Sequence, residues 1–331
     1  MSTRSRPATR IILTAIACVL ALCGGAAQAQ TYPTKPIRLV VPFPAGTGAD
    51  LSARRVAQSM ASILNQAIVV ENRAGAGGAV GSDFVARAPA DGYTLLAGTL
   101  NTHAMNPWLY RNLPYDPVRD FVPITRITTF PNVLVVPSSL KVNTLAELVA
   151  LAKQRKDRPL TFGSGGVGTT AQLSAELLKQ TVGIEALHIP YQGTSQAMAD
   201  VLAGRVDMIF GNIPVVLPHI KSGALHALAI TSLTRSPLLP DVPTVEELGI
   251  KSAEISVWIA LFAPKGTPPD IVNAISRTAL AALDKPEVQQ GFAQDGADPV
   301  RDATSADFAR VLKADIDRWG KVVKASGVTP E

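Results

Sequence analysis

Apolar and polar residues follow one another in a regular order from residue 36 onward. Apolar runs of strand length occupy 36–41, 67–72 and 92–98, and apolar residues at helical spacing fill 49–64 and 80–88. Regular alternation of strand and helix predicts a parallel sheet covered by helices on both faces.

The same alternation begins again after a less regular stretch at 99–131. We predict strands at 132–136, from 160, at 185–191 and at 206–210, and helices at 144–155, from 171 and at 194–204. Two alternating blocks predict two α/β domains.

The last third of the chain predicts a return to the first domain. A strand is expected at 225–231, an apolar run that can cross back at 255–262, and helices at 269–283, 286–294 and 305–326. Two connections between two domains predict a hinged cleft. We place one domain at 30–130 together with 254–331, and the other at 131–253.

The first 29 residues are typical of an export signal. Three arginines precede a twelve-residue apolar run, 11–22, and Ala27 and Ala29 occupy the positions that a signal peptidase reads. The run is too short to span a bilayer, which needs about twenty residues. We predict cleavage after Ala29 and a periplasmic location. Both cysteines, Cys18 and Cys23, lie in this segment, so the mature chain has no thiol chemistry.

Charge argues against a nucleic-acid partner. The 31 lysines and arginines less the three in the signal leave 28, against 26 acidic residues, a net charge of +2. This balance gives no basic footprint. The ligand-sensing half of a transcription regulator has the same architecture, but the export signal and the lack of an N-terminal DNA-binding helical segment disfavour it.

The stretch from 160 to 170 predicts an anion site. An apolar run breaks into glycines and ends in two hydroxyls, with Ser164, Gly165, Gly168, Thr169 and Thr170 before the helix. The unpaired N–H groups and the dipole at a helix N-terminus favour an anion, and glycines let a ligand approach the main chain. Thr169 and Thr170 can donate to a carboxylate or cap the helix.

Two other interpretations of these glycines are open. Gly163, Gly165 and Gly168 satisfy G-x-G-x-x-G, but the acidic residue that a dinucleotide site needs at the end of the next strand is missing, because Glu185 stands at its opposite end. The glycines can also serve only a tight turn. A small-anion site without a cofactor is the interpretation that we favour.

Five loops leave strands at the carboxyl ends, where open α/β sheets bind ligands. They span 43–50, 98–106, 163–170, 191–194 and 210–214, and contain no lysine or arginine. An anion there would be met by helix N-termini, backbone donors and hydroxyls, which suits reversible capture.

Seven motifs along the chain resemble those of the Bug-type substrate-binding proteins of tripartite tricarboxylate transporters. They are YPxKPI at 32–37, VPFP at 41–44, ENR with GAGG at 71–78, DGYTLL at 91–96, THA at 102–104, PYQG at 190–193 and GNIP at 211–214. The resemblance covers nearly the whole mature chain. It implies a type II periplasmic binding protein fold, with two α/β domains joined by two crossing segments around a cleft.

The family also implies a function: a receptor that closes over a small carboxylate and delivers it to membrane permease subunits. We expect a monomer without a cofactor, and no metal site, because the four histidines lack a metal-ligand spacing such as H-E-x-x-H. By position, the loops at 43–48 and 191–193 would clasp the ligand. The candidate ligand-binding residues are Phe43, Pro44, Ala45, Gly46, Thr47, Asp50, Thr99, Asn101, Thr102, His103, Ser164, Gly165, Gly168, Thr169, Thr170, Tyr191, Gln192, Gly193 and Asn212.

Two departures from the family pattern put the ligand in question. Ala45, Gly46 and Thr47 stand where the family usually has Pro-Gly-Gly, and Gln172 stands where it commonly has histidine. Neither departure affects the predicted fold. Di- or tricarboxylates and aromatic acids are all compatible with neutral loops.

Several residues have an alternative role. Gly193-Thr194-Ser195 imitates a nucleophile elbow, with His219 and His226 downstream, so an exported hydrolase is the alternative function. His103 can support backbone or contact the ligand, and Asp50 can favour its helix N-terminus or read an amino or hydroxyl group.

Overall fold

The computed structural model describes residues 32–155, 157–250, 255–302, 304–326 and 328. The predicted signal sequence and the boundary at 253/254 lie outside these residues. Within 35–331 a single sheet runs in the order β2-β1-β3-β9-β4-β7-β5-β6, with β8 and β10 also paired to β4. The strands are β1 Ile37–Val41, β2 Ile68–Asn72, β3 Thr94–Thr99, β4 Phe121–Pro137, β5 Leu160–Ser164, β6 Ala186–Pro190, β7 Met208–Asn212, β8 Leu225–Ile230, β9 Ser256–Pro264 and β10 Asp298–Pro299.

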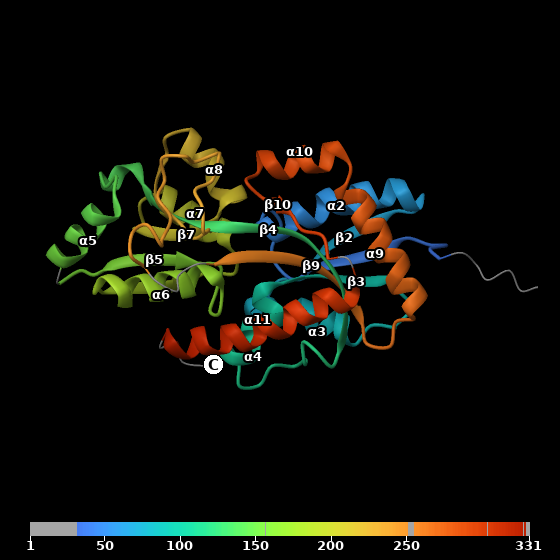
Figure 1. Ribbon diagram of the computed structural model, residues 1–331. Helices are drawn as coiled ribbons and strands as arrows, with labels where there is room; N and C mark the ends of the chain where they lie inside the picture. Colours follow the sequence, from blue (N-terminus) through green and yellow to red (C-terminus); the bar gives the residue numbers. More distant parts are fainter. Residues whose placement is uncertain (1–31, 156, 251–254, 303, 327, 329–331) are drawn as a thin grey trace, which may run out of the picture. The chain divides into compact units, whose positions relative to one another are not determined.

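Helices pack against this sheet (Figure 1). They are α2 Gly48–Leu64, α3 Ala79–Ala86, α4 Asn106–Leu109, α5 Leu145–Gln154, α6 Thr170–Val182, α7 Thr194–Leu202, α8 Ile213–Lys221, α9 Pro269–Leu283, α10 Pro286–Gln294 and α11 Ser305–Ala325. Short 3-10 turns occupy Ala76–Gly78 and Ser138–Leu140, and a π-helical turn occupies Asn101–Met105.

Strand β4 belongs to both halves of the sheet. It pairs antiparallel with β9 from Phe121 to Pro131, and with β7 and β8 from Asn132 onward. We call the strands on the β9 side, with residues 121–131, lobe 1; β5 to β8, with residues 132–137, form lobe 2. The predicted domain boundary at 130/131 lies beside this change of partner and remains a prediction.

Strands β4 and β9, which connect the two lobes and are called the crossing strands below, correct two expectations. Residues 121–131, expected to be irregular, form a strand whose register shifts between Pro123 and Thr125 and between Arg126 and Thr128. Such shifts, together with Pro123 and Pro131, hide the alternation of buried and exposed residues by which a strand is predicted. The sheet is also mixed, because β4 and β9 run antiparallel to their neighbours, whereas β1, β2 and β3 are parallel to one another.

Helix α8 was not predicted and stands where we expected only a cleft loop. Pro214 lies in its first turn, where a missing N–H costs nothing, but Pro218 lies inside the helix. Two prolines in nine residues obscure the helical pattern. By contrast, α9 and α10 begin and end where the sequence predicts.

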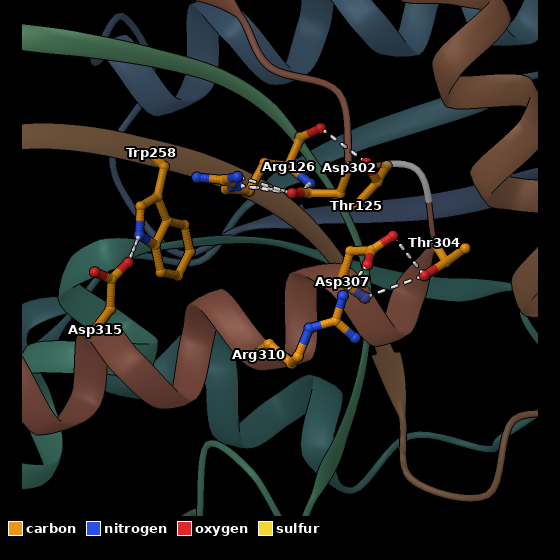
Figure 2. Close-up of polar contacts among 8 residues, drawn as sticks. All are labelled: Thr125, Arg126, Trp258, Asp302, Thr304, Asp307, Arg310 and Asp315. Atoms are coloured by element: carbon orange, nitrogen blue, oxygen red, sulfur yellow. Dashed lines mark hydrogen bonds and ion pairs between the residues drawn. The ribbon is translucent and has the colours of Figure 1, made fainter.

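The final helix and the chain just before it are tied to β9 and β4, respectively, as Figure 2 shows. In β4, Arg126 donates to Asp302, with Nη2 2.8 Å from Oδ1, and the Asp302 side chain is 4% exposed. In β9, Nε1 of Trp258 lies 2.8 Å from Oδ2 of Asp315 on α11. Burial raises the pKa of Asp315 despite this hydrogen bond. Asp315 thus holds α11 against lobe 1, and Asp302 holds the segment that leads into α11.

Among the described residues, helices with the length and apolarity needed to cross a membrane are absent.

Candidate ligand-binding site

A small cavity lies between the two lobes, at the ends of the strands. Its volume is about 40 Å³, enough for about three water molecules. Lobe 1 contributes Phe43, Thr47, Ala49, Thr99, Asn101, Phe130, Val257 and Ile259, and lobe 2 contributes Gly165, Thr169, Thr170, Ala171, Gly193, Thr194 and Asn212.

Four helices begin at this cavity. The first residues of α2, α6 and α7 line it, and so does Asn212, the residue before α8. The first N–H groups of a helix have no acceptor inside the helix, and its dipole places partial positive charge there. The cavity therefore combines several sets of backbone donors, which favour an anion.

The threonine hydroxyls at the cavity differ in whether their protons are free to donate to a ligand. Thr47 and Thr169 cap α2 and α6 and donate their protons to Pro44 and Gly166, each over 2.9 Å. Within the described part of the chain, the hydroxyls of Thr170 and Thr194 make no hydrogen bond. These two hydroxyls can therefore donate to a ligand, whereas the protons of Thr47 and Thr169 are already used.

The cavity wall carries no charged side chain among the described residues. Groups of three or more His, Cys, Asp or Glu side chains able to hold a metal ion are likewise absent from this part of the chain. The remaining wall is apolar and includes Phe43, Phe130, Val257 and Ile259. Recognition here rests on neutral donors and acceptors and on apolar contact.

The two lobes touch directly around the cavity. Nδ2 of Asn101 donates to the carbonyl of Gly168 over 3.0 Å, and the Tyr110 hydroxyl lies 3.4 Å from the carbonyl of Val167. A Cβ at Gly193 would stand 2.7 Å from Cγ of Pro44. The cleft is therefore closed in this structure.

Residues 52–328 match the family described as "Tripartite tricarboxylate transporter family receptor". The chain belongs to this receptor family. The periplasmic binding protein BugD is 35% identical, with a TM-score of 0.87, and the match covers 91% of this chain and 100% of BugD.

Two solved structures that contain carboxylates are also similar. R. palustris Rpa4515, determined with adipate, is 37% identical, with a TM-score of 0.87, 91% of this chain and 100% of that chain being covered. MatC (Rpa3494) from Rhodopseudomonas palustris, with bound malate, is 32% identical, with a TM-score of 0.83 and coverage of 88% and 100%. The predicted Bug-type family and type II periplasmic binding protein fold are confirmed.

The structure brings about half of the predicted site residues of the receptor to the cavity: Phe43, Thr47, Thr99, Asn101, Gly165, Thr169, Thr170, Gly193 and Asn212. Tyr191 and Gln192 line a neighbouring groove of about 300 Å³, which shares Phe43 and Gly165 with the cavity. Tyr191 also donates to Asp200 over 2.6 Å. Burial is the main cause that raises the pKa of Tyr191 to about 12, and the hydrogen bond to this carboxylate is the second.

Asp50 lies behind the first loop of the receptor. Its carboxylate accepts from the N–H of Gly46, from Nδ2 of Asn72 and from Nε of Arg54, each over 2.9 Å. Burial acts to raise the pKa of Asp50, but the hydrogen bonds outweigh it and the pKa is lowered. Asp50 therefore holds the loop that contains Pro44, Ala45 and Gly46, which do not line the cavity themselves.

His103 is packed inside lobe 1. Its ring stacks on Phe262 with centroids 3.7 Å apart, and Nδ1 lies 2.8 Å from the hydroxyl of Thr102. Burial lowers the pKa of His103 to about 3. Neither His103 nor Thr102 lines the cavity.

Ser164 and Gly168 shape the glycine loop from behind. The Ser164 hydroxyl lies 2.6 Å from Nε2 of His188 and 2.9 Å from the carbonyl of Gly166. Burial, with a contribution from Lys179, lowers the pKa of His188 to about 4. The N–H of Gly168 donates to Oε1 of Gln172 over 2.7 Å. The residue at the family's histidine position thus supports the loop.

Sequence reasoning missed six residues that line the cavity: Ala49, Phe130, Ala171, Thr194, Val257 and Ile259. Ala49, Ala171 and Thr194 follow predicted residues by one or two positions. Val257 and Ile259 alternate along β9, so a period of two places them on one face. For Phe130 the pattern holds no signal, because the register of β4 shifts before it.

The hydrolase alternative lacks its catalytic contacts. Ser195 is exposed, and the hydrogen bonds of the described residues do not join its hydroxyl to a histidine. Nδ1 of His226 lies 3.0 Å from the carbonyl of Val142. The acidic residues that follow Ser195, Asp200 and Asp207, pair with Arg205 and Arg155.

Proposed function

We propose that this protein is a periplasmic receptor that reversibly binds a small carboxylate in the cavity between its lobes. The observation that carries the proposal is the convergence of the starts of α2, α6 and α7 with Asn212 on one neutral cavity. Backbone donors and hydroxyls hold a carboxylate without an ion pair, so release stays possible.

The ligand would stabilise the closed cleft because it contacts both lobes only there. The predicted site residues at the cavity would make these contacts, while Asp50, Ser164 and Gly168 support the loops. Adipate in Rpa4515 and malate in MatC support a carboxylate as the ligand class.

The proposal includes delivery to the membrane permease subunits of a tripartite tricarboxylate transporter, which the family match supports. We extend the proposal to export with cleavage after Ala29, to a monomeric state, and to a binding role without catalysis, metal or cofactor. Among the described residues the exposed Ser195 hydroxyl has no hydrogen bond to a histidine, which argues against the hydrolase alternative.

A thermal-shift screen of residues 30–331 tests the proposal. The panel contains mono-, di- and tricarboxylates, amino acids, sugars and dinucleotides. A ligand that binds only the folded state adds about 2.7 kcal/mol to its stability at a hundredfold excess over Kd.

We expect a rise in Tm with one or a few carboxylates. A rise with sugars or dinucleotides, and with none of the carboxylates, would contradict the proposal. A Thr170→Val variant keeps the side-chain volume but removes the free hydroxyl, and we expect it to reduce the carboxylate shift.

A further inference from the structure

Two asparagines at the cavity have already used their amide nitrogens. Nδ2 of Asn101 donates to the carbonyl of Gly168 over 3.0 Å, and Nδ2 of Asn212 donates to Oδ1 of Asn132 over 2.7 Å. An amide side chain has donors only on nitrogen and acceptors only on oxygen. Among the described residues, neither Oδ1 of Asn101 nor Oδ1 of Asn212 accepts a hydrogen bond, so each is left as a free acceptor.

Chemistry fixes the orientation of Asn101. The carbonyl of Gly168 can only accept, and turning the amide over would bring two oxygens to the 3.0 Å that now separates Nδ2 from the carbonyl oxygen. Asn101 lines the cavity, and its Oδ1 is not among the side-chain atoms sealed from solvent without a partner. This oxygen therefore opens into the cavity.

Asn212 is held from lobe 2. Asn132 stands opposite it in the register of β4 and β7 and is fully buried. The N–H of Asn132 donates to the Thr231 hydroxyl over 2.9 Å. Oδ1 of Asn212 lies 3.3 Å from the point where a Cβ on Gly48 would stand, so it faces the start of α2 across the cleft. The positive end of the helix dipole there favours an oxygen over an amide nitrogen, which sets the direction of the Asn212–Asn132 bond although Nδ2 of Asn132 is left buried without a partner.

These two oxygens differ from every other polar group that we place at the cavity. Backbone N–H groups only donate, which suits a carboxylate, and hydroxyls can rotate to donate or accept. The amide oxygens only accept. A ligand without a donor would leave both unpaired in a closed cleft, which costs binding free energy.

We infer that the ligand carries a hydroxyl group beside its carboxylate, and that the amide oxygens of Asn101 and Asn212 select a hydroxycarboxylate over the same acid without the hydroxyl. This inference rests on the proposed function. The closed cavity of about 40 Å³ limits the acid to a short carbon skeleton.

An ammonium group would also donate to these oxygens, but it would bring a positive charge into a neutral cavity. The nearest carboxylate in the first loop, Asp50, does not line the cavity and is already bonded to Arg54 and Gly46. A charge without a partner is costly to bury. The neutral hydroxyl is therefore the donor that the site accommodates.

Calorimetric titration of the full mature chain with matched acids tests the inference. The pairs are malate with succinate and lactate with propionate, and aspartate and alanine supply the amino counterparts. We expect a hydroxy acid to bind at least about tenfold more tightly than its unsubstituted partner. Asn101→Leu and Asn212→Leu keep the volume and remove the acceptor, so the ratio should fall towards one.

Asn143→Leu is the matched control, because Asn143 is exposed and outside the cavity. The ratio of its affinities for the hydroxy and the unsubstituted acid should equal that of the unchanged receptor. The ratio of the unchanged receptor tests the inference by itself, even if a leucine variant fails to fold.

Equal binding of hydroxy and unsubstituted acids would overturn the inference and leave the proposed carboxylate receptor standing. A preference for aspartate or alanine would overturn the choice of a hydroxyl. An unchanged ratio in both leucine variants would overturn the assignment to these amides. No binding of any carboxylate would overturn the proposed function and this inference together.

Discussion

Nδ2 of Asn101 and the carbonyl oxygen of Gly168 lie 3.0 Å apart, although the two residues belong to different lobes. A hydrogen bond of this kind contributes about 0.5–1.5 kcal/mol net. Asn101→Ala should therefore lower the ratio of closed to open receptor about two- to tenfold in the absence of ligand. Small-angle X-ray scattering would report this as a larger radius of gyration, with Asn143→Ala as the control. An unchanged radius would mean that other contacts hold the cleft closed.

Gly48→Ala tests whether the packing of Phe130 at the cavity wall, within lobe 1, is needed for binding. A Cβ at Gly48 would stand 2.8 Å from Cζ of Phe130, a residue that is buried and lines the cavity. Overpacking costs about 1–3 kcal/mol, so we expect affinity to fall by about 5- to 150-fold.

The Tm of Gly48→Ala should fall as well, because Gly48 and Phe130 belong to the same lobe and the overpacking outweighs the better helix propensity of alanine. Ser62→Ala, on an exposed position of α2, serves as the control in calorimetric titration. Unchanged affinity in Gly48→Ala would show that Phe130 moves aside at no cost.

Acidification should destabilise the receptor in part through His103. Its pKa in the folded protein is about 3, against 6.5 for an unperturbed histidine. Between these values the unfolded chain binds the proton and the folded chain does not, so stability rises with pH from about 3 to 6.5 and is lost as pH falls. His188, with a pKa of about 4, acts in the same direction.

The slope of Tm against pH should be smaller in His103→Gln than in the unchanged protein. His219→Gln, which alters a residue outside these contacts, should keep the original slope. Equal slopes in all three proteins would contradict burial of a neutral imidazole at position 103.

Asp50→Asn should weaken binding without changing selectivity, because Asp50 orders the first loop and does not line the cavity. Replacing an acceptor of several buried hydrogen bonds costs about 1–3 kcal/mol of stability. Urea unfolding measures this loss, and Asp284→Asn, in an exposed ion pair with Arg301, should cost less than about 1 kcal/mol. A changed preference among acids would instead place Asp50 at the ligand.

Ser195→Ala separates a receptor from a hydrolase. Ser195 is exposed at the start of α7, and it does not line the cavity although its neighbour Thr194 does. We expect ligand affinity to stay within a few-fold of the original value, as calorimetric titration would measure. Loss of an ester-cleaving activity in this variant would revive the hydrolase alternative.

The sequence predicts elements well where one pattern dominates. The helical spacing and initial prolines of α9 and α10 give their bounds directly. β4 is different, because Pro123 and Pro131 and two register shifts disturb its alternation. Its pairing with β9 is set by tertiary contact, which a local pattern does not contain.

The same distinction applies to the site. The sequence predicts Thr170 and Asn212 as site residues because the loops at the carboxyl ends of the strands bind ligands in open α/β sheets, and this rule does not require the domain arrangement to be known. The apolar wall was not found, because the sequence does not tell which face of β9 meets the cavity. The role of Asp50, in α2, depends in part on Asn72, which stands 22 residues later at the end of β2.

The hydrogen bonding of β4 on both sides of Asn132 limits how the receptor can open. The N–H and the carbonyl of Asn132 both bond to Thr231, so this residue cannot turn as a free pivot. An opening motion that keeps both bonds would take its rotation at other residues of β4 and β9, so the lobes would turn without loss of the pairing at Asn132.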